Sequence, residues 1–393
     1  MNILVVLSIA VIQVTMAHSI YESPRRFLSE RRFKAFSQNK QLNMGEKTLE
    51  LMGCLTSLET WITDLKHDKA YQDLPFKSLI LPGAHHAGLQ QVKASPQYKA
   101  ALFTAFMNGG DISGIPQQLQ DNFINLISIT QVLSLDQLLK SGVRYLDMRL
   151  TGDLSNGNIV LSHLFLSDHK ASDFLETLNT FMTNNPGEIV ILHVRDEFQS
   201  DFTRPGFNVT KAQIEALITN YIDETFILDS SQVDSPIKDI QGGIFLTGDF
   251  PLDTILDTIQ FTDPWPITFA STPQSVIDNI FTYLNNEVKQ DSIDGVSRVD
   301  PYVTLTNLEI ATSLNFYLSY PSPGQYTQAQ LDVLDPGNLL RKADISNKLF
   351  LDSVKSQVKD YSILNIINSD KITPEVSIQI INLNQELRGL IGQ

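Results

Sequence analysis

From residue 78 onward, short apolar runs alternate with stretches of helical periodicity. Eight runs have the length and composition of buried strands: residues 78–81, 143–148, 159–161, 189–194, 243–246, 267–270, 303–305 and 363–367. Helical patterns lie between several of them, at residues 133–140, 171–183, 211–225, 274–286 and 328–333. Strands that alternate with helices predict a parallel α/β domain, and eight strands favour a closed (β/α) barrel.

The segments outside these runs also carry signals. Apolar side chains at helical spacing in residues 49–65 predict a helix that covers one end of the barrel. Residues 90–129 are long for one connection and contain helical patches, so we interpret them as an elaborated first loop, a candidate lid over the barrel mouth. Pro321-Ser-Pro-Gly324 and Asp335-Pro-Gly-Asn338 mark later loops.

The N-terminus predicts export. The apolar run at residues 3–12 is too short to span a bilayer and is followed by small residues up to Ala17, which indicates a signal peptide over residues 1–17, although no Lys or Arg precedes the run. We assign residues 18–70 to an N-terminal arm that ends in the covering helix, and residues 71–393 to one barrel domain. The arm includes a basic patch with interleaved phenylalanines. A solvated arm packed on the domain, a membrane-touching helix and a dibasic processing site remain open.

Composition narrows the class of protein. The chain has 393 residues, 42% of them hydrophobic, which is ample for one large core. Its net charge of −15 disfavours nucleic acid as a partner. The single cysteine, Cys54, excludes an internal disulfide, and Asn208-Val209-Thr210 is a glycosylation sequon on a predicted loop. No later segment reaches the length of a membrane span, so we expect a soluble extracellular protein of unspecified oligomeric state.

Polar side chains follow the predicted strands. In parallel barrels the active site is built at the carboxyl ends of the strands. Those ends give His85 and His86 after the first strand, Asp147 and Arg149 after the second, His163 after the third, Arg195 and Glu197 after the fourth, Asp249 after the fifth, and Asn365 and Asp370 near the last. A further histidine, His193, sits inside an apolar run, and we interpret it as a core residue.

Two histidines and an arginine suit the cleavage of a phosphodiester. One imidazole accepts the proton of an attacking hydroxyl and the other donates a proton to the leaving oxygen. A guanidinium binds phosphate through two hydrogen bonds and stabilises charge that develops on its oxygens. Structural alternatives remain open at this point: exposed loop histidines for His85 and His86, and simple ion pairs for Asp147 with Arg149 and for Arg195 with Glu197.

Five motifs in order carry a resemblance to a known family. They are Leu81-Pro-Gly-Ala-His85; Ile129-Thr-Gln131 leading to Gln137 and Gly142-Val-Arg-Tyr-Leu-Asp-Met-Arg149; Ile159-Val-Leu-Ser-His163; Phe181 through Pro186-Gly-Glu-Ile-Val-Ile-Leu192; and Ile363-Leu-Asn-Ile-Ile-Asn-Ser-Asp370. With these motifs the chain resembles the X-domain of phosphatidylinositol-specific phospholipase C, in its bacterial and X-domain-only forms, over about residues 70–390. The family's fold is a distorted TIM-type barrel, in agreement with the barrel that the periodicity predicts.

The resemblance implies roles for the strand-end residues. His85 would be the general base on the inositol 2-hydroxyl, His163 the general acid for the diacylglycerol oxygen, and Arg149 the phosphate ligand. Asp370 is the best match for the carboxylate that orients the base, with Asn365 as a rival. Asp147 would lie beside Arg149, and Arg195 and Glu197 would contact the inositol ring.

The resemblance also implies chemistry without a metal or another cofactor. Calcium-dependent relatives carry a second acid at the position of Arg149, where a guanidinium supplies positive charge and repels calcium. Two positions depart from the family. His86 replaces an Asp that supports the general acid in bacterial relatives, so we group His86 with the substrate-binding residues, and Asp249 stands where an inositol-binding arginine is expected.

These observations leave three candidate functions. The first is a secreted phosphodiesterase that cleaves an inositol phospholipid at a membrane surface into a cyclic phosphate and diacylglycerol. The second is a catalytically weak barrel that binds a phosphorylated headgroup or a lipid surface, suggested by His86 and Asp249. The third is a phosphodiesterase for a different headgroup, since barrels of this type vary by their loops.

Overall fold

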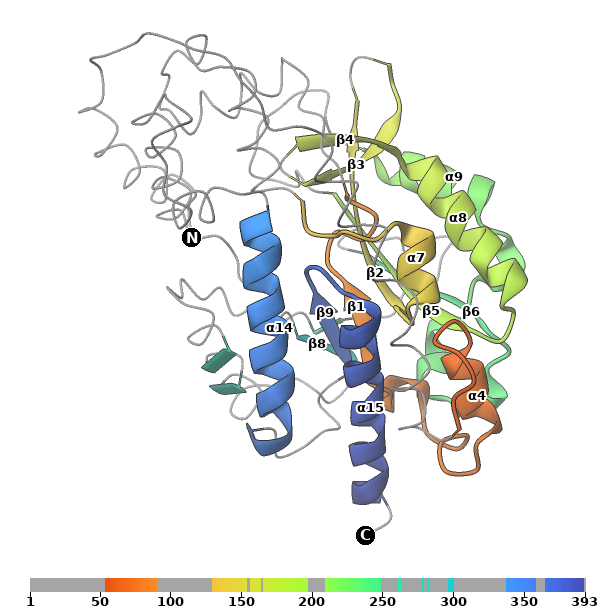
Figure 1. Ribbon diagram of the computed structural model, residues 1–393. Helices are drawn as coiled ribbons and strands as arrows, with labels where there is room; N and C mark the ends of the chain where they lie inside the picture. The colour runs from red at the N-terminus through yellow and green to blue at the C-terminus, as the bar shows by residue number, and fades with distance from the viewer. Residues whose placement is uncertain are drawn as a thin grey trace, which may run out of the picture.

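The computed structural model describes residues 54–90, 129–153, 156–163, 165–196, 209–248, 261–262, 277–278, 281–282, 296–299, 337–357 and 365–391. The helices are α4 Trp61–His67, α7 Leu135–Lys140, α8 Ala171–Asn184, α9 Lys211–Tyr221, α14 Gly337–Gln357 and α15 Pro374–Ile391 (Figure 1). The strands are β1 Leu81–Ala84, β2 Tyr145–Gly152, β3 Ile159–His163, β4 Phe165–Lys170, β5 Ile189–Asp196, β6 Gly243–Gly248, β7 Phe261–Thr262, β8 Val296–Val299 and β9 Ile366–Ser369. Short 3-10 turns lie at Phe76–Ser78, Glu224–Phe226, Ser230–Asp234 and Ile237–Asp239.

Seven strands form a parallel array in the order β7-β8-β9-β1-β2-β5-β6. Within the described ranges the two end strands of this array, β6 and β7, do not pair with each other, so the sheet is open there. The predicted α/β class and the distorted barrel are confirmed. The sheet differs from an all-parallel barrel at β3 and β4, a hairpin that pairs antiparallel with the carboxyl half of β2.

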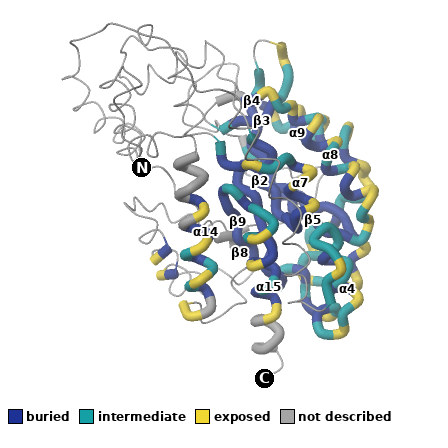
Figure 2. Tube along the Cα trace, viewed as in Figure 1, coloured by how far each residue is buried: buried dark blue, intermediate teal, exposed yellow. Residues whose placement is uncertain are grey.

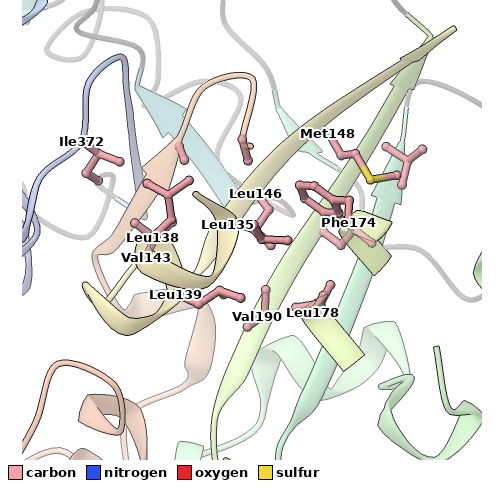
Figure 3. Packing of buried hydrophobic residues seen from close by; sticks show 14 of the residues in the cluster. Leu135, Leu138, Leu139, Val143, Leu146, Met148, Phe174, Leu178, Val190 and Ile372 are labelled. Carbon is pink, nitrogen blue, oxygen red and sulfur yellow. The ribbon is translucent and has the colours of Figure 1, made fainter. Parts of the chain in front are cut away.

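The two faces of the sheet carry different side chains because alternate residues of a strand point to opposite sides. Tyr145 pairs with Ile191, and both pack in an inner cluster at the amino-terminal half of the strands. Their even-numbered neighbours, such as Leu146, belong to an outer cluster with side chains of α7 and α8 (Figure 3). Figure 2 shows that the central strands are buried along most of their length.

Polar residues replace apolar ones on the inner face toward the carboxyl ends. Two residues after the Tyr145–Ile191 pair, Asp147 pairs with His193, and two residues later Arg149 pairs with Arg195. The same alternation that fills the lower barrel with apolar side chains therefore directs charged ones into its upper mouth.

A buried ion pair fastens helix α4 to the amino-terminal end of the barrel. The Arg144 Nε donates to a Glu188 carboxylate oxygen at 2.7 Å, and both side chains are fully buried. The second Glu188 oxygen accepts from the backbone and the hydroxyl of Thr63 on α4, at 2.8 and 2.6 Å. The indole of Trp61 donates to the Gly142 carbonyl at 3.0 Å, so α4 covers the end of the barrel as predicted.

The covering helix is shorter than the predicted 49–65. It begins at Trp61, and residues 54–60 form turns and bends instead. The reason is local, because the Asp64 carboxylate accepts from the Thr56 amide at 2.6 Å and from its hydroxyl. This arrangement folds the preceding chain back across the first turn of α4.

The first strand lies later than predicted. Residues 76–78 form a 3-10 turn, and β1 begins at Leu81, so Pro82 and Gly83 are inside the strand and do not end it. Gly83 fits there because the strand passes close to its neighbours: a Cβ at this position would lie 2.9 Å from the Tyr145 Cδ1. The Pro82 carbonyl accepts from the Arg144 amide, which ties β1 to the start of β2.

The predicted third strand exists, but its expected parallel direction is wrong. The Asp153 carbonyl accepts from the Gly157 amide at 2.8 Å, and this tight turn reverses the chain directly, without a crossover helix. Strand β3 therefore runs antiparallel to β2, with Leu150 paired to Leu161. Strand β4 was not predicted because its polar residues Ser167 to Lys170 lack an apolar run.

The C-terminal part also departs from the prediction. Helix α14 begins at Gly337, inside the predicted loop at Asp335–Asn338, and α15 was not predicted. Strand β9 ends at Ser369, two residues beyond the predicted run, and α9 ends at Tyr221, four residues before its predicted end. The ends of β9 and α9 are therefore shifted, whereas α14 and α15 are helices that the sequence patterns did not predict.

Several predictions fall outside the described residues. They are the signal peptide and the basic arm, most of the first loop at 90–129, the strands at 267–270 and 303–305, the helix at 328–333, the loop at Pro321–Gly324 and the sequon residue Asn208. Of the predicted helix at 274–286, residues 277–278 and 281–282 are described and helical. In the part of the chain that the structure describes, no helix combines the length and apolarity needed to cross a bilayer.

The Arg144–Glu188 pair gives a stability prediction. Glu188→Gln leaves the buried guanidinium without a charged partner, and we expect the free energy of unfolding to fall by about 3–5 kcal/mol. Urea denaturation followed by circular dichroism measures the change. Asp136→Asn, which removes an exposed ion pair with Lys140, is the matched control and should leave the midpoint nearly unchanged. Equal midpoints for Glu188→Gln and wild type would show that the pair does not fasten the barrel.

Candidate functional site

Strand β1 delivers two adjacent histidines to the mouth of the barrel. The His85 amide donates to the carbonyl of Ser369, the last residue of β9, at 3.1 Å, and the Ala87 amide donates to the Asp147 carbonyl of β2 at 2.8 Å. Between these anchors His86 takes a left-handed backbone conformation with φ of 45°. Both histidines are buried, with exposures of 4% and 2%, so they are not exposed loop residues.

His85 lies between a carboxylate and a guanidinium. Its Nδ1 is 2.6 Å from the Asp370 Oδ1, and its Nε2 is 3.0 Å from the Arg149 Nη2. Because a guanidinium can only donate, Nε2 accepts this hydrogen bond and the ring proton of neutral His85 resides on Nδ1, directed at Asp370. The geometry therefore leaves a lone pair on Nε2, the property that a general base needs.

Arg149 is held by Asp147, two residues earlier on the same face of β2. Its Nη2 donates to an Asp147 oxygen at 3.1 Å, and its Nε lies 3.3 Å from both oxygens. Burial by itself raises the pKa of Asp147, but the guanidiniums of Arg149 and Arg195 outweigh it and hold the pKa well below its ordinary value. Asp147 is thus an anion that fixes the orientation of Arg149.

His163 reaches the same place from the hairpin. Because β3 runs antiparallel to β2, its last residue returns toward the carboxyl end of β1. The ring of His163 stacks on that of His86, with centroids 3.7 Å apart and an angle of 25° between the planes. The centroids of His85 and His163 are 6.1 Å apart. The structure thus brings the two predicted catalytic histidines together around the ring of His86.

The other predicted site residues have different positions. Arg195 is half-buried opposite Arg149 on β5, whereas Glu197 and Asp249 fall outside the described residues. His193 is buried, as predicted, and its Nδ1 is 2.6 Å from the Tyr145 hydroxyl. Asn365 directly precedes β9, and its side chain donates to the Lys77 carbonyl. It therefore lies at the amino end of β9, whereas His85 lies near the carboxyl end.

The sequence analysis did not identify the residues that hydrogen-bond to the backbone of the site. The Gln131 side chain donates to the carbonyls of His85 and Ser369 at 2.8 and 2.9 Å, and the Thr130 hydroxyl donates to that of His85. Asn347 of α14 donates to the Asp370 carbonyl at 2.9 Å. The quoted motif Ile129-Thr-Gln131 was the signal for the first two. No sequence signal pointed to Asn347, because helix α14 was not predicted.

The surroundings keep His85 and His86 neutral. Burial is the largest cause that lowers the pKa of His85 well below its ordinary value, followed by the repulsion that protonated His86 would exert and by the positive charge of Arg149. Burial likewise lowers the pKa of His86, with Arg149 and His163 next. Chemically, the arrangement offers a neutral base, a fixed guanidinium and a second imidazole. Among the described residues no group of three His, Cys, Asp or Glu side chains is arranged to hold a metal ion.

Comparison with known proteins gives both sequence and structural matches. Over 117 residues the chain is 32% identical to 1-phosphatidylinositol phosphodiesterase of Listeria monocytogenes, a match that spans 30% of this chain and only about a third (35%) of that relative. The fold is similar to phosphatidylinositol-specific phospholipase C from Listeria monocytogenes, with a TM-score of 0.51 and 18% identity over 83% of this chain and 98% of that chain. The Staphylococcus aureus phospholipase C gives a TM-score of 0.51 and 16% identity, over 83% and 97%. No family model matches the chain.

The neutral, buried histidines predict a pH dependence of stability. Because their pKa is lower in the folded chain than in the unfolded one, the unfolded state binds more protons below about pH 6.5, and stability falls as the pH drops. Each histidine contributes a loss of about 1.4 kcal/mol per pH unit in that range. Urea denaturation between about pH 7.5 and 5 measures the slope.

Substitution of single histidines tests which residues cause this dependence of stability on pH. His86→Asn should reduce it by the share of one histidine. His67→Asn, at an exposed position on α4, controls for the loss of a histidine outside the site. A free energy of unfolding that stays constant over this pH range would contradict the assignment of two neutral buried imidazoles.

Proposed function

We propose that this chain, a homologue of the bacterial phosphatidylinositol-specific phospholipases C, is a phosphodiesterase of the same type. One observation carries the proposal: His85 accepts from Arg149 on one ring nitrogen and contacts the Asp370 carboxylate with the other. A base, its orienting carboxylate and a phosphate-binding guanidinium are thereby assembled at the barrel mouth.

In the proposed reaction the inositol 2-hydroxyl is the internal nucleophile. Its proton passes to His85 Nε2, and its oxygen forms a bond to phosphorus. The bond between phosphorus and the diacylglycerol oxygen breaks, and that oxygen takes a proton from His163. The products are a cyclic inositol phosphate and diacylglycerol. The rings of the proposed base and acid lie 6.1 Å apart, centroid to centroid, at the same mouth of the barrel.

Arg149 supplies the positive charge at the phosphate. Its guanidinium is fixed by Asp147, so it can bind the non-bridging oxygens and stabilise their charge in the transition state without reorganising. A guanidinium at this place repels a divalent cation, which is why we propose chemistry that needs no metal. Arg195 faces the same mouth and is proposed to contact the inositol ring, and Glu197 is assigned to that ring from the resemblance alone.

The proposal includes an extracellular location and contact with a membrane surface. The apolar run at residues 3–12 supports a signal peptide and an extracellular location, and Asn208 supports glycosylation. The substrate is an inositol phospholipid, so the barrel mouth has to meet a lipid surface. With a net charge of −15, we propose that this contact is local and does not involve the bulk of the surface.

A second candidate function is binding without turnover. It is favoured by one contact, because Arg149 donates to the same His85 nitrogen that has to accept the substrate proton. A headgroup that leaves this hydrogen bond intact would be held by Arg149 and Arg195 but not cleaved. The choice between the two candidates is a matter of measured turnover.

Turnover on phosphatidylinositol vesicles, with EDTA present, tests the proposal. We expect wild type to release diacylglycerol and cyclic inositol phosphate. His85→Ala should lower kcat by about 100-fold or more through loss of the base, and Arg149→Ala should lower it by about 100- to 1,000-fold through loss of charge stabilisation. His67→Ala on the opposite end is the control. A folded wild type that binds vesicles but shows no turnover would move the binding function to first place.

Asp370→Asn tests the orientation of the base. An amide can donate to His85 Nδ1, which moves the ring proton to Nε2 and removes the lone pair. We expect kcat to fall by about 100-fold or more while KM stays close to that of wild type. Asn365→Ala, at the other end of β9, should retain the wild-type kcat. The reverse result would assign the orienting role to Asn365.

A further inference from the structure

We propose that His86 is a positioning residue: its ring is a spacer that fixes the separation and the orientation of the His85 and His163 rings. The inference rests on the proposed function above, which uses His85 as base and His163 as acid and leaves His86 without a part. It changes the sequence interpretation of His86 from a residue that binds substrate to one that acts through its two histidine neighbours.

The distances between the three rings support this role. The His86 centroid is 3.9 Å from that of His85 and 3.7 Å from that of His163, whereas the latter two are 6.1 Å apart. These three distances form an obtuse triangle with His86 at its wide corner, so the ring of His86 lies between the other two. The base and the acid cannot approach each other more closely while this ring remains in place.

The backbones of His86 and His163 are anchored in different ways. The residues on either side of His86 are hydrogen-bonded to two different strands, His85 to Ser369 at the end of β9 and Ala87 to Asp147 of β2. In contrast, His163 lies two residues beyond Leu161, the last residue of β3 that is paired with β2. A ring at the end of a hairpin is thus seated against a ring that is fixed to the parallel array.

Face-to-face stacking also suits the charge that His163 has to carry. Burial, Arg149 and His163 lower the pKa of His86, which keeps that ring neutral. The face of a neutral aromatic ring accommodates a neighbouring cation, so protonated His163 can remain stacked. At 2% exposure His86 is in contact with protein and not with solvent, as a spacer between rings requires.

Two variants separate the ring of His86 from its nitrogen atoms. Asparagine tolerates the left-handed backbone but has no ring, whereas phenylalanine keeps a flat ring without a polar atom. On phosphatidylinositol vesicles, we expect His86→Asn to lower kcat by about 10- to 100-fold at an unchanged KM, as loss of an orienting partner does. His86→Phe should recover most of this loss. His67→Asn, exposed on α4, controls for loss of a histidine.

Two outcomes would overturn the proposal. If His86→Asn keeps the wild-type kcat, the spacer is not needed. If His86→Asn and His86→Phe lose activity equally while both keep the wild-type melting temperature, the polar atoms of His86 act and not its ring.

Nuclear magnetic resonance of histidine-labelled protein gives a readout that does not need turnover. We expect nuclear Overhauser contacts between the rings of His86 and His163 in wild type, and a displaced His163 ring resonance in His86→Asn. If wild type shows these contacts but does not cleave phosphatidylinositol, the proposed function fails and the spacer arrangement stands. If folded, active wild type lacks them, the spacer is wrong. This measurement decides the question even if His86→Phe does not fold.

Discussion

The ion pair between Arg144 and Glu188 is the interaction on which the rest of the molecule depends. Two charges fully removed from water are costly unless all their hydrogen-bonding groups are satisfied. Here the guanidinium also donates to the carbonyls of Leu139, Val143 and Glu59, and the carboxylate accepts from Thr63. The pair stands directly before β2 and β5, and so sets the height and register of the two strands that carry Asp147, Arg149 and Arg195.

The position of the candidate site follows from the alternation of side chains along β2 and β5. The inward side chains of β2 and β5 are apolar at the first pair and charged at the last, so one face of one sheet serves as core below and as site above. Charge at that depth is stable only because Asp147 compensates Arg149. The candidate site is therefore stabilised in the same way as the base of the barrel, by an ion pair within the sheet.

Sequence patterns predicted the structure best where one simple rule operates. Continuous apolar runs located β2, β5 and β6, and the rule that parallel strands share their carboxyl end placed His85, Arg149 and Asp370 together. Prediction failed where the outcome depends on tertiary pairing. Strand β4 has a polar sequence, and the direction of β3 is decided by a turn. The stacking of His86 on His163 depends on that direction, which no periodicity encodes.

The contact between His85 and Asp370 joins residues 285 positions apart. Strand β1, which ends just before His85, pairs with β9, which ends just before Asp370. Arg149 and His163, on β2 and β3, precede β9 by about 200 residues of the chain and are synthesised well before it. His85 consequently acquires its Asp370 partner only when the C-terminal part of the chain has been made and has docked. Under the proposed function, a truncated chain therefore carries the proposed phosphate ligand Arg149 but not the carboxylate that orients His85.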